Sequence, residues 1–71
     1  MDYPTSTSSI RQAAYFEAIR EADKTLDEAL SNVRADFNAG RTSLAAAATE
    51  RCGLLERHLS ECRRLRREML P

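Results

Sequence analysis

The sequence contains few of the residues that interrupt a helix. Its only glycines are Gly40 and Gly53, and its only prolines, Pro4 and Pro71, lie close to the two termini. Alanine, leucine, glutamate and arginine, which favour helices, are abundant instead. A chain of 71 residues has room for one domain, and it buries a smaller share of its surface than a larger domain does. We therefore expect an all-α protein that needs a partner to complete its core.

Long apolar stretches are also missing. No run approaches the roughly 20 apolar residues of a membrane-spanning helix. The N-terminal residues MDYPTSTSS lack the basic start and apolar centre of a signal peptide. We therefore expect a soluble, cytoplasmic protein. Ten arginines beside a single lysine are typical of a GC-rich coding sequence, and we expect a small bacterial protein.

Metal ligands and catalytic groups are scarce. The chain has one histidine and two cysteines without a Cys-x-x-Cys motif, so we expect no metal site and no cofactor. Cys52 and Cys62 lie ten residues apart on a predicted helix, a separation of about 15 Å that exceeds the limit of about 7 Å for a disulfide. We interpret both as small buried apolar residues. The sequence also lacks a phosphate-binding loop and a set of nucleophile, base and orienting group, and we expect no enzyme.

A first helix is expected over about residues 9–38. Residues 1–8 are polar and contain a proline, so we interpret them as a flexible tail. Ser9 and Gln12 match a capping box that starts the helix. Apolar residues then follow at alternating steps of three and four, with one interruption at position 23. They are Phe16, Ile19, Leu26, Leu30, Val33 and Phe37.

A turn over about residues 39–42 and a second helix over about residues 43–70 complete the domain, residues 9–71. Gly40 can adopt the left-handed conformation that closes a helix, and Thr42 or Ser43 can cap the next one. One seam of the second helix is expected to contain Ala45, Ala48, Cys52, Leu55, Leu59, Cys62 and Met69, flanked by Leu44, Ala47, His58 and Leu65. The pattern predicts a two-helix antiparallel αα-hairpin.

The apolar surface of such a hairpin exceeds what one neighbouring helix can cover. We expect two hairpins to pack, in the manner of a coiled coil, into a homodimeric four-helix bundle; a different helical partner is the alternative. The residues expected at this dimer or partner interface are Tyr15, Phe16, Ala22, Ala29, Cys52, Leu59 and Met69.

One polar pair interrupts the predicted seam. If residues that lie level on the two helices have numbers that sum to about 81, Asp23 lies beside His58. Single polar residues in helical seams can fix register and partner number, so we interpret the pair as a buried polar layer. An acid/base pair or a pH switch is the alternative, because histidine titrates near neutrality.

Four arginines crowd the end of the second helix: Arg63, Arg64, Arg66 and Arg67. Cations are favourable at a helix C-terminus, and Arg64 can reach Glu68 while Arg57 can reach Glu61. We therefore expect a non-enzymatic protein-protein interaction or regulatory module that acts as a homodimer without a membrane. The alternative is a small nucleic-acid-binding regulator that contacts polyanions through the four arginines.

Overall fold

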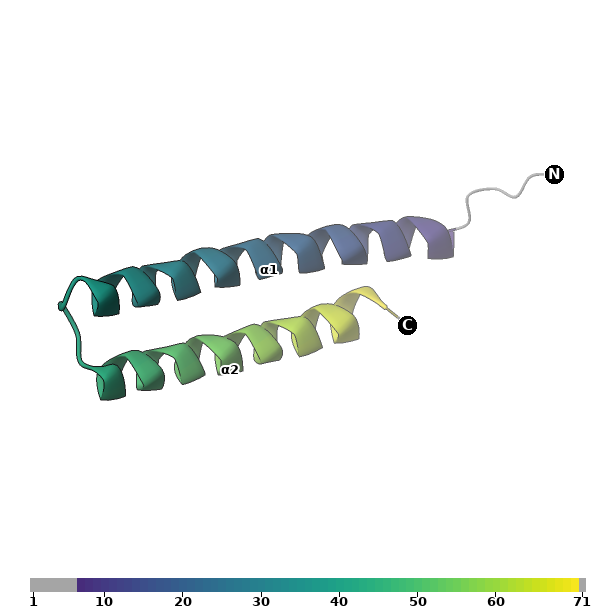
Figure 1. The fold of residues 1–71 in the computed structure, drawn as a ribbon. Coiled ribbons are helices and arrows are strands. Elements are labelled where there is room, and N and C mark those ends of the chain that lie inside the picture. Colours follow the sequence, from purple (N-terminus) through teal and green to yellow (C-terminus); the bar gives the residue numbers. More distant parts are fainter. Residues whose placement is uncertain (1–6, 71) are drawn as a thin grey trace.

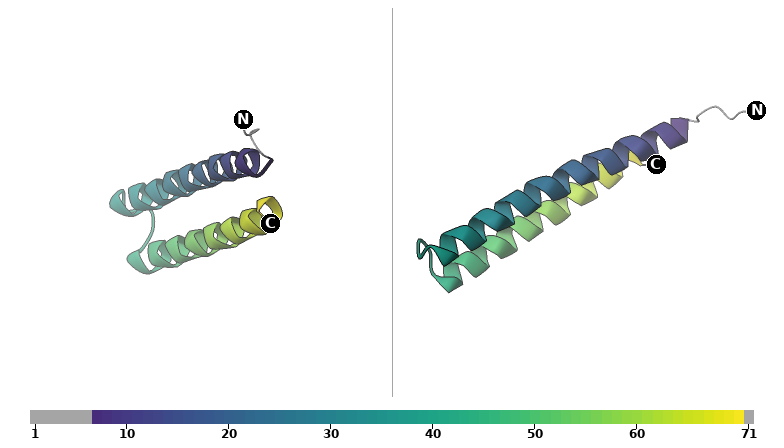
Figure 2. Two further views of the ribbon diagram at one scale, coloured as in Figure 1. Left: turned by 90° about the vertical axis from the view of Figure 1, so that its right-hand side faces the viewer. Right: turned by 45° about the horizontal axis from the view of Figure 1, so that its top comes forward.

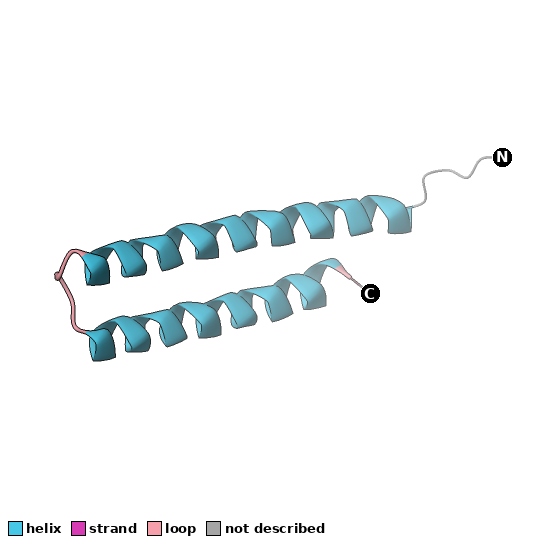
Figure 3. Cartoon of the chain, viewed as in Figure 1, coloured by secondary structure: helices cyan, strands magenta, loops and turns pink. Residues whose placement is uncertain are grey.

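Two antiparallel helices joined by a short turn make up residues 7–70, the part of the chain that the computed structural model describes (Figure 1). Helix α1 spans Thr7–Asn38 and helix α2 spans Leu44–Met69. The described residues contain no strand (Figure 3). The two helices lie side by side in each of two further views (Figure 2), and their Cα atoms extend 18 Å across the pair and 9 Å through it. The predicted all-α hairpin is confirmed.

Helix α1 begins two residues before the expected start. The first six residues of the predicted tail lie outside the described residues, and Thr7 already belongs to α1. Ser9 consequently lies inside the first helical turn, so the prediction that it caps the helix with Gln12 is wrong. Residues 5–9 are all serine or threonine, and each has a side chain suited to capping, so sequence alone cannot choose among them.

The end of α1 follows the predicted glycine chemistry. Gly40 has φ of +78°, the left-handed conformation that side-chain-bearing residues rarely adopt. Its backbone N–H donates to the carbonyl of Phe37 at 3.0 Å, and the N–H of Arg41 donates to the carbonyl of Asp36 at 2.8 Å. These two bonds form a Schellman motif, which satisfies carbonyls that a helix end otherwise leaves without donors. The Arg41 Nε also donates to Asp36 Oδ1 at 2.9 Å.

The start of α2 selects one of the two predicted caps. Ser43 has an extended backbone, and its Oγ accepts a hydrogen bond from the N–H of Ala46 at 3.1 Å. Ser43 rather than Thr42 therefore supplies the N-cap. The reversal of the chain is complete within residues 39–43, which keeps the two helices in a defined register.

The hairpin has a sparse core. Only three described residues are buried, namely Val33 and Ala47, each 7% exposed, and Leu65, 8% exposed. No described side chain is fully buried. A residue in the core of a folded domain typically contacts six to twelve others on all sides, and a layer one helix thick cannot provide that.

The seam predicted for α2 is wrong in detail. The residues that face α1 include Ala47, Leu54 and Leu65, whereas Cys52 and Leu59 of the predicted seam are exposed. Apolar residues occupy about half of the circumference of α2 at 100° per residue. One neighbouring helix covers only part of so wide an arc. Cys52 is exposed in the single hairpin for the same reason, so its predicted burial depends on the predicted dimer or partner interface, while Cys62 is half-buried.

Candidate functional site

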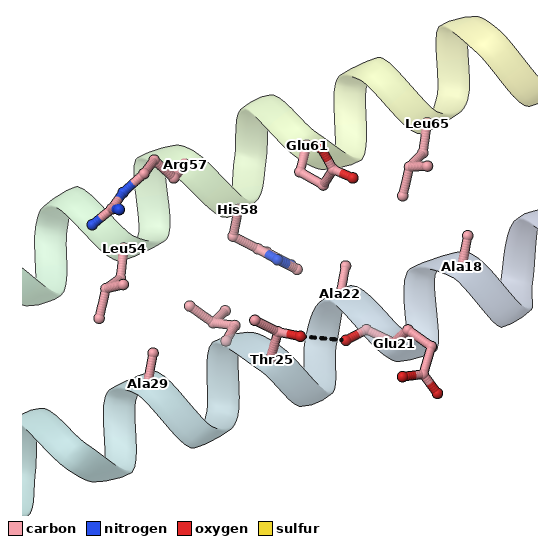
Figure 4. Close-up of a pocket in the computed structure, with 11 residues that line it drawn as sticks. Ala18, Glu21, Ala22, Thr25, Ala29, Leu54, Arg57, His58, Glu61 and Leu65 are labelled. Carbon is pink, nitrogen blue, oxygen red and sulfur yellow. Dashed lines mark hydrogen bonds between the residues drawn. The ribbon is translucent and has the colours of Figure 1, made fainter.

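A shallow groove runs along one side of the hairpin. It has a volume of about 560 Å³. Small residues of α1 face leucines of α2 across it, and charged side chains border it (Figure 4). Its lining residues are Ala18, Glu21, Ala22, Thr25, Leu26, Ala29, Leu54, Arg57, His58, Glu61 and Leu65. The Thr25 hydroxyl donates to the carbonyl of Glu21 at 3.1 Å, so it bonds within its own helix.

The opposite side of the hairpin carries larger side chains. Helical spacing places one stripe of each helix there, because steps of three and four residues return to the same face. None of these residues lines the groove. We call this surface the apolar face; its apolar residues are Phe16, Ile19, Leu30 and Phe37 of α1 and Leu44, Ala48, Cys52, Leu55, Leu59 and Cys62 of α2, and the same spacing places the charged Asp23, Arg34 and Arg66 among them.

Several large side chains of the apolar face are open to solvent. Phe16 is 66% exposed, Leu44 68%, Leu59 49% and Phe37 41%. The ring of Tyr15 packs edge-on against Phe16, with the ring centroids 5.4 Å apart. Large exposed apolar side chains that share one side of a small protein indicate a site of interaction with another molecule. The apolar face is therefore the leading candidate for a functional surface.

The seven residues predicted for the interface do not lie on one surface. Phe16, Cys52 and Leu59 belong to the apolar face. Ala22 and Ala29 line the groove on the other side. Tyr15 and Met69 are half-buried. An interface through one side of the hairpin can therefore include only part of the predicted set.

The predicted polar pair forms, but it is not buried. The Nε2 atom of His58 lies 3.0 Å from Oδ1 of Asp23, so the two residues lie level as the register predicted. The His58 side chain is 20% exposed and that of Asp23 is 58% exposed, and none of the described polar residues is buried. The prediction of a buried layer is wrong for the single hairpin, because Asp23 lies among the residues of the apolar face, which faces water.

A cysteine joins this pair. Cys62 Sγ lies 3.4 Å from the same Nε2 atom of His58 that contacts Asp23. A catalytic relay needs the nucleophile and the orienting carboxylate on different ring nitrogens, so the shared nitrogen does not provide that geometry. Sequence reasoning missed Cys62 here, although its position four residues after His58 puts the two on one helix face. Among residues 7–70 there is no group of three or more His, Cys, Asp or Glu residues that could hold a metal ion.

The arginine cluster divides into two parts. Arg64 forms ion pairs with Glu61, on Nε at 3.0 Å, and with Glu68, on Nη1 at 2.7 Å. The hydrogen bond from Arg64 lowers the pKa of Glu61, and the two carboxylates raise the pKa of Arg64. The predicted contact between Arg57 and Glu61 is absent, and Arg57 Nε instead approaches the carbonyl of Gly53 at 3.4 Å.

The other three arginines of the cluster face away from α1. Arg63, Arg66 and Arg67 line a shallow depression with Leu70, of about 370 Å³. The structure shows no ion pair for these three within residues 7–70. Their charge is therefore directed to solvent at the C-terminal end of α2.

Comparisons with known proteins identify no relative. No protein-family model matches the chain, and no curated protein or solved structure is significantly similar to it. In residues 7–70, neither helix is long and apolar enough to cross a membrane. Inferences about function therefore depend on the surfaces of the hairpin itself.

Proposed function

We propose that the protein is a non-enzymatic helical interaction module that acts as a homodimer, with two hairpins forming a four-helix bundle. The observation that carries this proposal is the exposure of Phe16, Leu44 and Leu59 on a hairpin that has no fully buried side chain. Covering such residues removes apolar surface from water, at about 25 cal/mol per Å². A second hairpin provides both the cover and the missing side of the core.

The contacts of the histidine support a role in binding rather than in catalysis. The histidine contacts Asp23 and Cys62 through one nitrogen, which does not suit a catalytic relay.

Both cysteines are free thiols, which persist in a reducing compartment, so the cytoplasm is the proposed location.

Sedimentation equilibrium combined with circular dichroism tests the homodimer. We expect a helical dimer at micromolar concentration, with helicity that falls as the dimer dissociates on dilution, because each hairpin alone has little core. A control variant, Ser60→Ala, changes an exposed residue outside both the groove and the apolar face and should behave like the wild type. A fully helical monomer at micromolar concentration would contradict the proposal.

Binding of nucleic acid is the second candidate function. The observation that favours it is the depression lined by Arg63, Arg66 and Arg67, whose charges have no acidic partner within the described residues. The overall charge of zero weakens the attraction to phosphate, and this is why interaction with protein is preferred.

Titration with duplex DNA and structured RNA at two salt concentrations separates the two candidates. Under the preferred function, binding stays at the sequence-independent level of roughly 10⁻⁴ to 10⁻⁶ M. Under the second, binding is tighter, weakens steeply with salt and disappears when Arg63, Arg66 and Arg67 are all changed to Gln. Changing Arg11, Arg34 and Arg51 to Gln is the matched control, because it removes the same charge elsewhere.

A further inference from the structure

We infer that the second copy packs its apolar face on the apolar face of the first, with the turns of the two hairpins at opposite ends of the bundle. This inference rests on the proposed homodimer and adds which surface is used and how the copies are oriented. Three observations support this arrangement independently. They are the size of the side chains on each side of the hairpin, the area of the apolar face and the distribution of charge along the hairpin.

Side-chain size favours the apolar face over the groove. The groove is lined on α1 by alanines and bordered by Glu21, Arg57 and Glu61, which would lose their hydration if a helix covered them. The apolar face presents Phe16, Leu44 and Leu59, which are exposed and uncharged. A second copy that covers this face therefore gains the larger burial of apolar surface.

The size of the face matches the needs of a stable dimer. Helix α2 has 26 residues and extends about 39 Å at 1.5 Å per residue. With a width of 18 Å across the two helices, the face offers a projected area of roughly 700 Å² per copy. Two copies together bury roughly 1,400 Å² or more, within the range of about 1,200 to 2,000 Å² for specific interfaces.

Charge decides the orientation. The end of the hairpin away from the turn, residues 7–20 and 58–70, carries 6 Lys+Arg and 3 Asp+Glu, a net charge of +3. The half that contains the turn, residues 21–57, carries 5 Lys+Arg and 7 Asp+Glu, a net charge of −2. With the turns at opposite ends, each positive end lies beside a negative half, whereas turns at the same end would bring the two positive ends together.

This orientation also gives the polar pair a central position. The middle of α2 falls near residue 57, and a two-fold axis between oppositely directed hairpins passes near that level. The Asp23–His58 contacts of both copies therefore lie close to the axis, where the second hairpin covers the exposed Asp23 carboxylate. A shift of one copy along the other would set these polar groups against apolar side chains, so the pair selects one register.

Distances between spin labels test the orientation. Ala39, an exposed turn residue, is changed to Cys in a chain with Cys52→Ala and Cys62→Ala, after this background is shown to dimerise like the wild type. We expect the two turn labels to lie about 40 Å apart, the length of α2. A separation below about 25 Å would place both turns at one end, given interaxial distances of about 10 Å between packed helices, and would overturn the inferred orientation.

A second label distinguishes a wrong orientation from the absence of a dimer. Ser60→Cys in the same background lies near the middle of α2, where the labels come within about 35 Å of each other in either orientation. A distance from Ser60 together with a short distance from Ala39 overturns only the orientation. No distance from either label, with a monomer in sedimentation, overturns the proposed homodimer and assigns the apolar face to another partner.

A pair of charge substitutions tests the choice of side. Leu59→Glu buries a carboxylate if the apolar face is the interface, and we expect the dimer dissociation constant to rise at least about 100-fold. Thr25→Glu adds the same charge in the groove and should change it less than about threefold. If Leu59→Glu does not fold, Phe16→Glu, at the other helix, replaces it. Weakening by Thr25→Glu without weakening by the apolar-face variants would overturn the inference.

Discussion

The two sides of the hairpin differ in the size of the side chains that the same two helices present. On the groove side, the small side chains of Ala22 and Ala29 on α1 leave a space next to Leu54 and Leu65 of α2. The charged residues at the border of this groove keep their hydration. On the apolar face, side chains as large as Phe16 project into solvent. One side of the hairpin is therefore compatible with contact with water, whereas the other side exposes large apolar side chains that packing against a second molecule would bury.

The difference follows from where large residues occur around each helix. Alanines on the groove side of α1 are small, so Leu65 can reach into the space between the helices and become buried. The exposed residues of the apolar face, Phe16, Phe37, Leu44 and Leu59, lie outside the line of contact between α1 and α2. Their apolar surface stays exposed in one hairpin however closely the two helices approach.

The largest expected effect comes from Leu65, the buried leucine beside the groove. Leu65→Ala should lower the free energy of unfolding by about 2 kcal/mol, at the lower end of the range for buried leucines because the core is thin. Leu59→Ala, on the apolar face, should instead act on assembly and raise the dimer dissociation constant about tenfold. Urea denaturation measures the first effect and sedimentation equilibrium the second. If Leu59→Ala leaves the dimer dissociation constant unchanged, the apolar face is not the dimer interface.

The turn that joins the two helices, and so holds both sides together, is the next most sensitive segment. Gly40→Ala should destabilise the protein by about 1 kcal/mol, because alanine is strained at a φ of +78°. Gly53→Ala is the matched control within α2, where an added Cβ meets no atom within 4 Å, and it should stabilise by about 0.5 to 1 kcal/mol. Thermal melting of both variants measures the two effects. A loss of stability in both would show that the strain at Gly40 is not the cause.

The polar pair tests whether Asp23 is covered by a second copy. In an exposed pair the coupling between Asp23 and His58 should be about 0.5 kcal/mol, and in a covered pair it should exceed about 1 kcal/mol. A double-mutant cycle with Asp23→Ala and His58→Ala gives the coupling free energy. We expect the higher value for the dimer. A coupling near zero would mean that the observed 3.0 Å contact contributes nothing to stability.

The smallest expected effect concerns the charged border of the groove. Because Arg64 lowers the pKa of Glu61 in the folded chain, this ion pair stabilises the fold above the ordinary pKa of glutamate. That stabilisation is lost as the pH falls through the lowered value. Glu61→Gln should therefore melt slightly below the wild type at pH 7 and level with it at pH 2. Glu56→Gln, on an exposed residue outside the groove, should change the melting temperature less at pH 7.

Much of the fold could be predicted from the sequence because local residues determine it. The absence of breakers between Ser9 and Gly40 predicted one long helix, and glycine chemistry predicted its end at the observed Schellman motif. The short turn then set the register, so the contact between Asp23 and His58 could be predicted from residue numbers alone. The two expected caps differed in outcome: the one at Ser43 was confirmed, whereas the polar run before Ile10 offered several equivalent starts.

Only the tertiary structure decided which half of the wide apolar arc of α2 faces α1. Residues such as Cys52 and Leu59 have the same helical spacing as Ala47 and Leu65, so their pattern predicts a buried stripe equally well. The choice depends on the rotation of α2 about its axis, which the packing of alanines against leucines sets. The rotation of α1 about its own axis likewise left Asp23 exposed beside His58. Sequence periodicity records that a face is apolar, whereas its burial depends on the neighbour that the folded chain places beside it.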